Sequence, residues 1–383
     1  MKKTSFQVAP GIGRRRFNYS ITEAGNKAKG KSFERFFLLL FCALFLFPCC
    51  SCAMHGNGQD GRDKVSLTDV AMGTVVNVTV YPGAGMSREE ADACVKDVLK
   101  LVRDLEEKRL SRKLETSELF QINQNAGNAQ GSAISKELSG LLDACGKMRV
   151  DSEGAFDVSI GALTVLWKMD ERAAGEENGA LPSEEELREA ISHCGSSRIR
   201  LQEGRVFLEE GVILELGSVG KGAALDEIAA FLEGRDLAGT FSLGGSILTY
   251  GEKPDGTAWK VGVTDPLQPD QILGTLSLKG QWCVSTSGDY ERYFMQDGVR
   301  YHHLLDPATG YPARSGVHSV TILCKNGFFS DALSTACFVL GKEKGMELAK
   351  KYDAEVLFVD ENGGISMSDG LKSIFSVANE RKP

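Results

Sequence analysis

Several kinds of signature are absent from this sequence, and each absence disfavours a class of protein. The chain of 383 residues holds ten cysteines, but none of those beyond residue 52 forms a C-x-x-C pair. The five histidines and these cysteines do not have the spacing of zinc ligands, so a structural zinc module is not expected. Basic residues are outnumbered, with 44 Lys and Arg against 52 Asp and Glu and a formal net charge of −8. Nucleic-acid-binding proteins normally carry a basic face, so that class is disfavoured.

The glycine-rich stretch at residues 212–234, VILELGSVGKGAALDEIAAFLEG, lacks the spacing of both common phosphate-binding motifs. A Walker A motif would need glycine in place of Glu215 and Ser or Thr in place of Gly222. The stretch is not a G-x-G-x-x-G dinucleotide motif either. If a nucleotide binds here, the protein must have a less common fold.

The same stretch has the pattern of a strand, a glycine loop and a helix. The apolar run Val212–Leu216 predicts the strand, and apolar residues at helical spacing up to Leu232 predict the helix. Glycines at 217, 220 and 222 allow backbone amides to approach an anion at the positive end of that helix. Two interpretations remain open, a phosphate site or a tight turn with nothing bound.

The N-terminal region is typical of an export signal. A leader rich in Lys and Arg precedes the apolar run Phe36–Phe47, which is short for a membrane span. The run ends in Pro-Cys-Cys-Ser-Cys, which resembles a bacterial lipoprotein processing site, with Cys52 favoured for lipidation over Cys50. An uncleaved anchor is the alternative. We therefore expect a leader at 1–52, a linker at 53–64, a folded domain at 65–378, and lipid anchoring to the cell envelope on the periplasmic face of the inner membrane.

The folded domain is predicted to place helices in its N-terminal half and strands in its C-terminal half, which is an α+β arrangement. Val65–Tyr81 has a strand or hairpin pattern with a bend at Met72, and Ser87 with Glu90 forms a capping box that opens a long helix. Gly244 and Gly245 interrupt a strand pattern, which indicates a bulge or a close approach by a ligand. The 42% hydrophobic content of the whole chain suits a globular core.

Four polar residues are candidates for chemistry, each with a structural alternative. Asp331 and Thr335 lie four residues apart on a predicted helix, so their oxygens share one face and suit Mg²⁺. The alternative is a helix-terminal charge and a packed threonine. Asp157 lies among apolar residues, where it needs a partner, a ligand or a capping role. His303 precedes an Asp-Pro turn and is either catalytic or structural.

Eight motifs occur in an order that resembles the ApbE family of flavin transferases. They cover the chain from about residue 65 to 378, and are found at residues 71–74 (AMGT), 117–119 (SEL) with Asn123, 154–157 (GAFD), 215–222 (ELGSVGKG), 243–245 (LGG), 286–290 (TSGDY), 303–307 (HLLDP) with 309–312 (TGYP), and 330–336 (SDALSTA). The resemblance implies a T-fold-like core with mixed or antiparallel sheets and packed helices, and a flavin cleft between two subdomains.

The resemblance also implies an activity and a set of site residues. The expected reaction uses Mg²⁺ and FAD as substrate, and moves FMN to a threonine hydroxyl of an acceptor flavoprotein with release of AMP. The positions that match FAD contacts are Met72, Ala155, Phe156, Asp157, Glu215, Lys221 and Leu305. The positions that match the metal site are Ser218, Asp331, Ser334 and Thr335. A base for the threonine is expected at His303 or Asp306.

Three positions depart from the pattern of many relatives. Lys113 occupies a position where an aromatic residue is common, Glu215 replaces a commoner aspartate, and Ser334 replaces alanine or aspartate. Aromatic stacking near residue 113 is therefore not expected. The metal site is expected to rest on Asp331 and Thr335, with a backbone carbonyl near Ser218.

Two other functions remain open at this stage. Water in place of the threonine would make the protein a periplasmic Mg²⁺-dependent FAD pyrophosphatase. A flavin-binding lipoprotein without chemistry is the second alternative, but such a carrier has no use for a metal at the pyrophosphate. The expected acceptors are subunits of membrane redox complexes or exported flavoproteins, and no nucleic-acid partner is expected.

Overall fold

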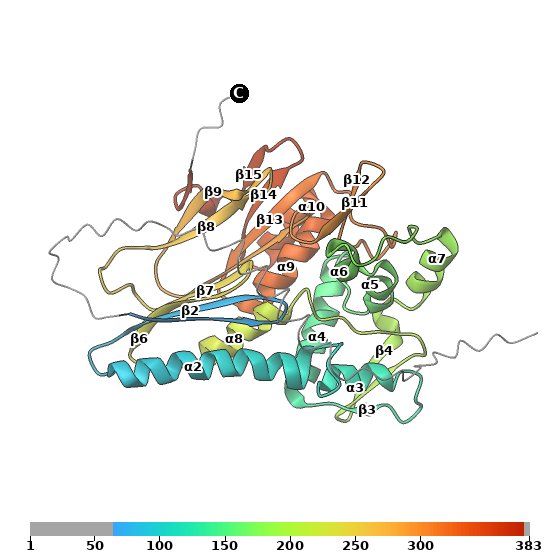
Figure 1. Ribbon diagram of the computed structural model, residues 1–383, viewed down its shortest axis with the longest axis horizontal. Helices are drawn as coiled ribbons and strands as arrows, with labels where there is room; N and C mark the ends of the chain where they lie inside the picture. The colour runs from blue at the N-terminus through green and yellow to red at the C-terminus, as the bar shows by residue number, and fades with distance from the viewer. Residues whose placement is uncertain (1–63, 379–383) are drawn as a thin grey trace, which may run out of the picture. The chain divides into compact units, whose positions relative to one another are not determined.

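The computed structural model describes residues 64–378 of the chain (Figure 1). The predicted leader and nearly all of the predicted linker, including Cys50 and Cys52, lie outside the described residues. Within 64–378, no helix is both long enough and apolar enough to cross a membrane.

An eight-stranded sheet forms the centre of the fold, and every neighbouring pair of its strands is antiparallel. In spatial order the strands are β1 (Val65–Ala71), β2 (Thr74–Pro82), β6 (Leu237–Leu243), β7 (Ser246–Tyr250), β10 (Trp282–Gly288), β13 (Val317–Cys324), β14 (Glu355–Asp360) and β15 (Ile365–Met367). The predicted α+β class with antiparallel sheets and packed helices is confirmed.

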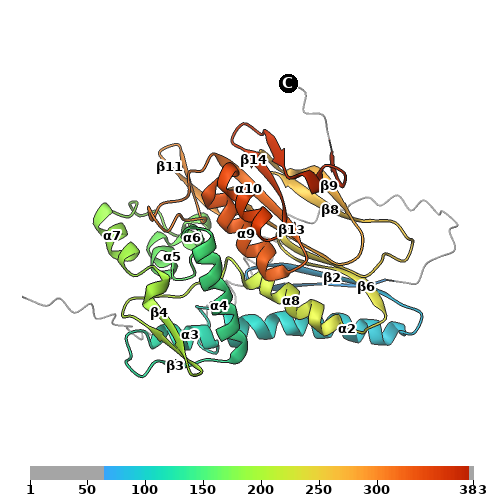
Figure 2. The ribbon, with the colours of Figure 1, turned by 180° about the vertical axis from the view of Figure 1, so that it is seen from behind.

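Other elements pack on both faces of the central sheet, although β1 and β2 expose Val70 and Val75 on one face. One face packs against helices, which are α2 (Arg88–Leu105), α8 (Gly220–Leu232), α9 (Gly327–Leu340) and α10 (Lys342–Lys351) (Figure 2). The other face packs against a three-stranded sheet of β8 (Trp259–Asp265), β9 (Gln268–Leu278) and β16 (Phe375–Val377). Successive residues of a strand point to opposite faces, so Phe358 joins the helical core and Val359 joins the core between the sheets.

A second region of short elements adjoins this core. Its elements are α3 (Glu118–Gln124), β3 (Ser132–Ala133), α4 (Lys136–Asp151), α5 (Gly161–Trp167), α6 (Met169–Ala173), α7 (Glu184–Ser192), β4 (Ile199–Gln202), β5 (Arg205–Leu208), and the hairpin of β11 (Tyr293–Gln296) and β12 (Val299–His302). Single turns lie at Glu106–Leu110, Ser196–Arg198 and Asp369–Leu371. Trp167 fastens the hairpin to α5, because its ring centroid lies 5.7 Å from that of Tyr301 and its Nε1 donates to the Gly310 carbonyl at 2.7 Å.

Local signals in the sequence predicted several element boundaries correctly. The bend at Met72 is a two-residue hairpin turn, with φ of 52° at Met72 and 67° at Gly73. The Ser87 and Glu90 capping box opens α2 as expected. In each case one or two residues determine the local geometry, so neighbouring sequence is sufficient.

The predicted strand at Val212–Leu216 is wrong, although the helix that follows it is confirmed. Its backbone makes one isolated parallel bridge, between Ile213 and Ile160, and belongs to none of the sheets. The Asn123 side chain instead bonds both backbone groups of Leu214, at 2.8 and 2.9 Å. The Glu215 amide donates to the Val158 carbonyl at 2.7 Å. The segment is extended and apolar because it is buried, while a side chain and a loop satisfy its polar groups.

Gly244 and Gly245 are a hairpin turn and not a bulge within one strand. They connect β6 to β7, and φ at Gly244 is +59°. The polar segment Ser285–Gly288 is the second half of strand β10. Its hydroxyls can lie in a strand because they bond to helix α9, as described below.

Helices α8 and α9 cross at two glycines. A Cβ added to Gly222 would lie 2.2 Å from the Gly327 carbonyl oxygen, and one added to Gly327 would lie 2.3 Å from the Gly222 carbonyl oxygen. Both distances are far below van der Waals contact, so the two backbones meet directly. This crossing places the first turn of α9 against the N-terminus of α8.

Gly327→Ala should therefore destabilise the fold by about 1–3 kcal/mol, because the new methyl group overpacks a backbone contact. Gly140→Ala is the matched control, since Gly140 is in α4 and a Cβ there meets no atom within 4 Å. The control should gain up to about 1 kcal/mol from helix propensity. Urea unfolding measures both effects. Equal stability of the two variants would show that the α8–α9 crossing is not tight.

Candidate active site

Asp331 joins helix α9 to the N-terminus of helix α8. Its Oδ2 accepts from the Gly222 amide at 2.9 Å, and its Oδ1 accepts from the Ser246 hydroxyl at 3.2 Å. Lys221 Nζ lies 3.8 Å from the same Oδ1. Asp331 is only 3% exposed, so its charge is balanced almost wholly by these protein groups.

A row of hydroxyls extends from Asp331 along α9 and across to β10. Ser285 and Ser330 are joined at 2.8 Å, and Ser287 and Ser334 are also joined at 2.8 Å. Ser334 additionally donates to the Asp331 carbonyl at 2.8 Å, within its own helix. Both bonds of Ser334 are thus structural. Thr335, by contrast, is only partly buried and lies 3.4 Å from the Ser287 hydroxyl.

These residues supply hard oxygen donors, which fit Mg²⁺ and not zinc. Residues 64–378 hold no group of three or more His, Cys, Asp or Glu side chains that could bind a metal ion. A metal here would depend on the Asp331 carboxylate, the Thr335 hydroxyl and oxygens of the substrate, an arrangement typical of Mg²⁺. Ser218 is partly exposed in the turn before α8, and its carbonyl oxygen would be a further metal ligand.

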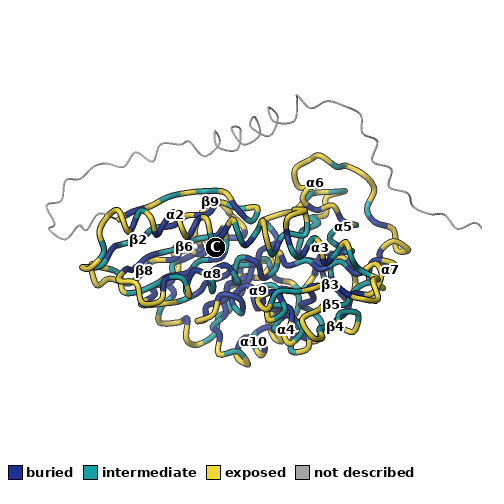
Figure 3. The backbone as a smooth tube through the Cα atoms, turned by 90° about the horizontal axis from the view of Figure 1, so that it is seen from below, coloured by how far each residue is buried: buried dark blue, intermediate teal, exposed yellow. Residues whose placement is uncertain are grey.

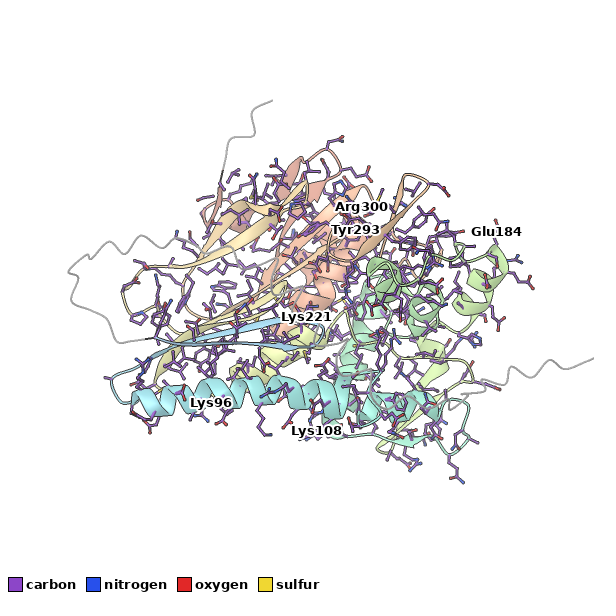
Figure 4. All side chains as sticks on the ribbon, in the orientation of Figure 1. Lys96, Lys108, Glu184, Lys221, Tyr293 and Arg300 are labelled. Carbon is purple, nitrogen blue, oxygen red and sulfur yellow. The ribbon has the colours of Figure 1, made fainter. Side chains whose placement is uncertain are left out.

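Glu291 belongs to the same site, although the sequence analysis did not single it out. Its Oε1 lies 3.3 Å from the position that a Cβ of Gly245 would occupy, and Gly245 is adjacent to Ser246. Surrounding protein raises the pKa of Glu291, and Asp331 adds to the rise, while Lys221 and Arg292 oppose it. The feature of the sequence that could have indicated Glu291 is its position directly after the TSGDY motif. We call Lys221, Glu291, Arg292, His303 and Asp331 the charged cluster; Lys221 is labelled in Figure 4.

His303 is held neutral and oriented by the backbone. Burial among protein atoms lowers its pKa well below the usual value, and the positive charges of Arg292 and Lys221, with the neighbouring His302, lower it further. Its Nδ1 lies 3.3 Å from the Arg292 carbonyl oxygen. Since a carbonyl oxygen only accepts, this bond needs the hydrogen on Nδ1 and leaves a lone pair on Nε2. A neutral imidazole with its lone pair on Nε2 is in the form that a general base requires.

Asp306 organises the turn that follows His303. Its Oδ1 accepts from the Ala308 amide at 2.9 Å and its Oδ2 accepts from the Thr309 hydroxyl at 3.1 Å. Leu305 is 6% exposed and packs in the small core around Trp167. The carboxylate of Asp306 is therefore committed to local structure, which makes His303 the better candidate for a base.

The expected FAD contacts at 155–157 and 215 occupy adjoining segments, each held by an ion pair. Asp157 accepts from Arg149 Nε at 2.6 Å and from the Ser159 hydroxyl at 2.6 Å. Glu215 pairs with Arg112 and accepts from the Gly217 amide at 3.0 Å. Phe156 is 1% exposed and packs in the main core, so its side chain is structural.

Met72, an expected FAD contact, and Lys113, one of the three departures, have clear local roles. Met72 occupies the left-handed turn between β1 and β2, and its amide donates to Glu106 Oε2 at 2.7 Å. Lys113 pairs with Asp170 at 2.7 Å, and Asp170 also pairs with Arg292 of the charged cluster at 3.2 Å. Asp170 of helix α6 therefore links the lysine, which replaces a common aromatic residue, to Arg292 of the charged cluster.

Comparison with known proteins identifies the class. A Treponema pallidum protein named FAD:protein FMN transferase is 32% identical over 362 residues, which cover 89% of this chain and 98% of that protein. A Vibrio cholerae protein of the same name is 28% identical, covering 82% of this chain and 91% of that protein. The chain is an enzyme of the transferase class. It belongs to the ApbE family, which it matches over residues 72–358.

Solved structures agree with this assignment. The ApbE protein of Thermotoga maritima superposes with a TM-score of 0.71 and 33% identity, over 82% of this chain and 99% of that one. The flavin transferase ApbE of Vibrio cholerae gives a TM-score of 0.71 and 26% identity over the same shares of the two chains, 82% and 99%. The predicted family is therefore confirmed by both sequence and fold.

His303 should stay neutral at pH 6.5, where an unperturbed histidine is about half protonated. NMR titration of the full chain in detergent, with His303→Gln to assign the signal, measures its pKa. Arg292→Gln should raise that pKa, because it removes a positive charge that disfavours the imidazolium. Arg103→Gln is the control, since Arg103 pairs with Asp69 and should leave the titration unchanged. An ordinary pKa near 6.5 in the unsubstituted protein would contradict the assigned environment.

Proposed function

We propose that the chain transfers the FMN half of FAD to a threonine hydroxyl of an acceptor flavoprotein. The product is a phosphoester of that threonine, and AMP is released. The observation that carries the proposal is His303, a neutral imidazole with its lone pair on Nε2, in a cluster with Lys221 at the N-terminus of α8. A base beside an anion-binding helix end suits the transfer of a phosphorus-linked group to a hydroxyl.

FAD would bind with its pyrophosphate at the N-terminus of α8. Lys221 would neutralise part of the negative charge, while the positive end of the helix stabilises the rest. The proposed contacts to the remainder of FAD come from Met72, the backbone at Ala155 to Asp157, Glu215 and Leu305. The ion pairs of Asp157 and Glu215 hold these two segments in place, so the binding surface is formed before the substrate arrives.

In the transfer step the threonine Oγ attacks the phosphorus on the FMN side of the pyrophosphate. One phosphorus–oxygen bond forms to the threonine, and the bond from that phosphorus to the bridging oxygen breaks. AMP leaves with the bridging oxygen, and the threonine proton passes to His303 Nε2. The Arg292 carbonyl keeps the Nδ1 proton in place and stabilises the imidazolium that forms.

Mg²⁺ would be held by Asp331, Thr335 and the carbonyl near Ser218, with Ser334 supporting Asp331 from the same helix. When bound, the ion would neutralise pyrophosphate charge and polarise the phosphorus–oxygen bond. The Ser334 hydroxyl donates to the Asp331 carbonyl and bonds to Ser287, so its proposed contribution is to position the helix.

FAD hydrolysis to FMN and AMP is a second candidate activity. Glu291 and His303 reach solvent, so water can occupy the place of the acceptor hydroxyl. A carrier without chemistry is disfavoured, because a buried carboxylate beside a lysine and a partly exposed threonine is a costly arrangement for simple flavin binding.

The deciding experiment incubates the full chain in detergent with FAD, Mg²⁺ and an unflavinylated acceptor protein. We expect AMP release together with a mass gain of one FMN on the acceptor. Asp331→Ala should reduce the rate at least about 100-fold, because it removes the charge that organises the site. Asp255→Ala, in an exposed turn, is the control and should match the unsubstituted rate. AMP with free FMN and an unmodified acceptor would establish the pyrophosphatase instead. Tight FAD binding without Mg²⁺-dependent AMP release would leave only the carrier.

His303→Gln and Asp306→Asn separate the two candidate bases. Loss of a general base lowers the turnover number by roughly 100-fold to 10,000-fold, and we expect this for His303→Gln. Asp306→Asn keeps the oxygen that accepts from the Ala308 amide, so it should retain most of the activity. The turnover number of each variant at saturating FAD provides the comparison. A loss confined to Asp306→Asn would reverse the assignment.

Export and lipid anchoring are part of the same proposal. The N-terminal pattern favours a chain anchored through Cys52 or Cys50 on the periplasmic face of the inner membrane. Acceptors would then be subunits of membrane redox complexes or exported flavoproteins, which meet the enzyme at the membrane surface.

A further inference from the structure

A groove of about 680 Å³ runs along strand β11. One wall is β11 with the two residues before it, and the opposite wall is the end of α6 and the segment after it. Most residues of the second wall are exposed (Figure 3). The lining residues are Arg172 to Gly175, Glu177 and Asn178 on one side and Glu291 to Gln296 on the other. Six residues of extended chain span about 20 Å, so the groove can hold a short extended peptide.

The edge of β11 that faces this groove is unpaired. Among residues 64–378, β11 pairs with β12 alone, in a two-stranded sheet. The His303 amide donates to the Arg292 carbonyl at 3.1 Å, so the register directs the backbone groups of Arg292, Phe294 and Gln296 toward β12. Tyr293 and Met295 therefore direct their N–H and C=O groups outward. An unpaired edge of this kind can accept a further strand.

The inner end of the groove is the charged cluster. Glu291 and Arg292 line the groove and belong to the cluster. The Arg292 carbonyl also binds both the amide and Nδ1 of His303. A chain lying along β11 would thus end at the residue that orients the proposed base. In Figure 4, Tyr293 and Arg300 mark the hairpin and Lys221 marks the start of α8.

FAD is not the expected occupant. None of the seven residues proposed to contact FAD lines the groove. The groove also has apolar, exposed side chains on the β11 side, with Tyr293 36% exposed and Met295 57% exposed. Exposed aromatic and methionine side chains are typical of protein-binding surfaces.

The walls of the groove are supported by aromatic packing. The ring of Phe294 stacks on that of Tyr301 at 5.3 Å, and Tyr301 stacks on Trp167 at 5.7 Å. The Arg172 guanidinium lies 5.0 Å from the centre of the Phe294 ring and donates to the carbonyls of Gly179 and Ala180. Arg172 therefore holds the second wall against the hairpin. A groove that is formed in advance lowers the entropic cost of binding a flexible peptide.

We propose that this groove binds the acceptor flavoprotein, by adding an extended segment of it to the outer edge of β11 so that its threonine reaches the charged cluster. The inference rests on the proposed FMN transfer, for which it names the surface that recognises the acceptor. Main-chain bonds to Tyr293 and Met295 would supply affinity that does not depend on the acceptor sequence. Side-chain contacts along the groove would select the segment that carries the threonine.

Two substitutions test the groove, and one matched substitution controls for the hairpin. Met295→Glu places a charge on the β11 wall, and Ala174→Trp fills the groove from the opposite wall. Val299→Glu is the control, because Val299 is an exposed apolar residue of the same hairpin, 39% exposed, and does not line the groove. With the full chain in detergent and an unflavinylated acceptor protein, both groove variants should raise the acceptor KM at least tenfold. Val299→Glu should keep the unsubstituted value, and the Kd for FAD, measured by flavin fluorescence, should be the same in all four proteins.

Amide hydrogen exchange provides a readout that does not depend on chemistry. A saturating amount of the acceptor protein should slow exchange in residues 293–296, while FAD alone should not. If the acceptor is flavinylated but the groove variants keep the unsubstituted KM for it, or if residues 293–296 stay unprotected, the acceptor does not bind in this groove. The proposed transferase function would still hold in that case. Raised Kd for FAD in the groove variants would make the groove part of the FAD site and overturn the inference. If the unsubstituted protein neither binds nor modifies the acceptor, the proposed transfer fails and the inference fails with it.

Discussion

The hydrogen bond from the Gly222 amide to the buried Asp331 carboxylate is the contact on which the site depends. It forms only because α8 and α9 approach until their backbones touch at Gly222 and Gly327. That single contact places a negative charge at the positive end of α8 and leaves Lys221 beside it. The hydroxyls of Ser246 and Ser334 then follow from β7 and α9. A side chain at either glycine would push the two helices apart, and Asp331 would then move away from the Gly222 amide and from Lys221.

Features determined by a few neighbouring residues were predictable from the sequence. The Ser87 capping box and the Met72 turn belong to this kind, since their geometry follows from side chains two or three positions away. The segment Val212–Leu216 shows where such reasoning stops. Its apolar pattern is real and its residues are buried, but Asn123, about ninety positions earlier in the chain, takes the hydrogen bonds that a neighbouring strand would have made. The pattern of apolar residues predicts that a segment is buried. It does not predict which groups form hydrogen bonds with the backbone of that segment.

The candidate site also has features that the sequence predicts and features that it does not. The order of motifs assigned the transferase family, and the spacing of Asp331 and Thr335 correctly placed them on one helix. The partners of these residues could not be read from spacing, because they depend on tertiary contacts. Asp157 and Glu215 are paired with Arg149 and Arg112. Glu291 of the charged cluster lies beside the Gly244–Gly245 turn, where the sequence predicts a bulge or a close approach within one strand. The Arg112–Glu215 pair and the approach of Glu291 to Gly245 join segments that are distant in sequence. Arg149 and Asp157 are only eight residues apart, but the pair depends on how the loop after α4 folds back on the helix.

The carbonyl that orients His303 belongs to the backbone of Arg292, and this has a consequence for how the family can vary. A main-chain oxygen cannot be removed by substitution, so the side chain at position 292 can change without loss of the tautomer. The number of residues between 292 and 303 cannot change so freely. The two residues lie opposite each other at the open end of one hairpin, and the Asp297–Gly298 turn sets the register of its strands. An insertion or deletion of one residue in that hairpin would move the carbonyl away from the imidazole. Hairpin length is therefore under stronger constraint than hairpin sequence, and relatives should tolerate many residue types there but few lengths.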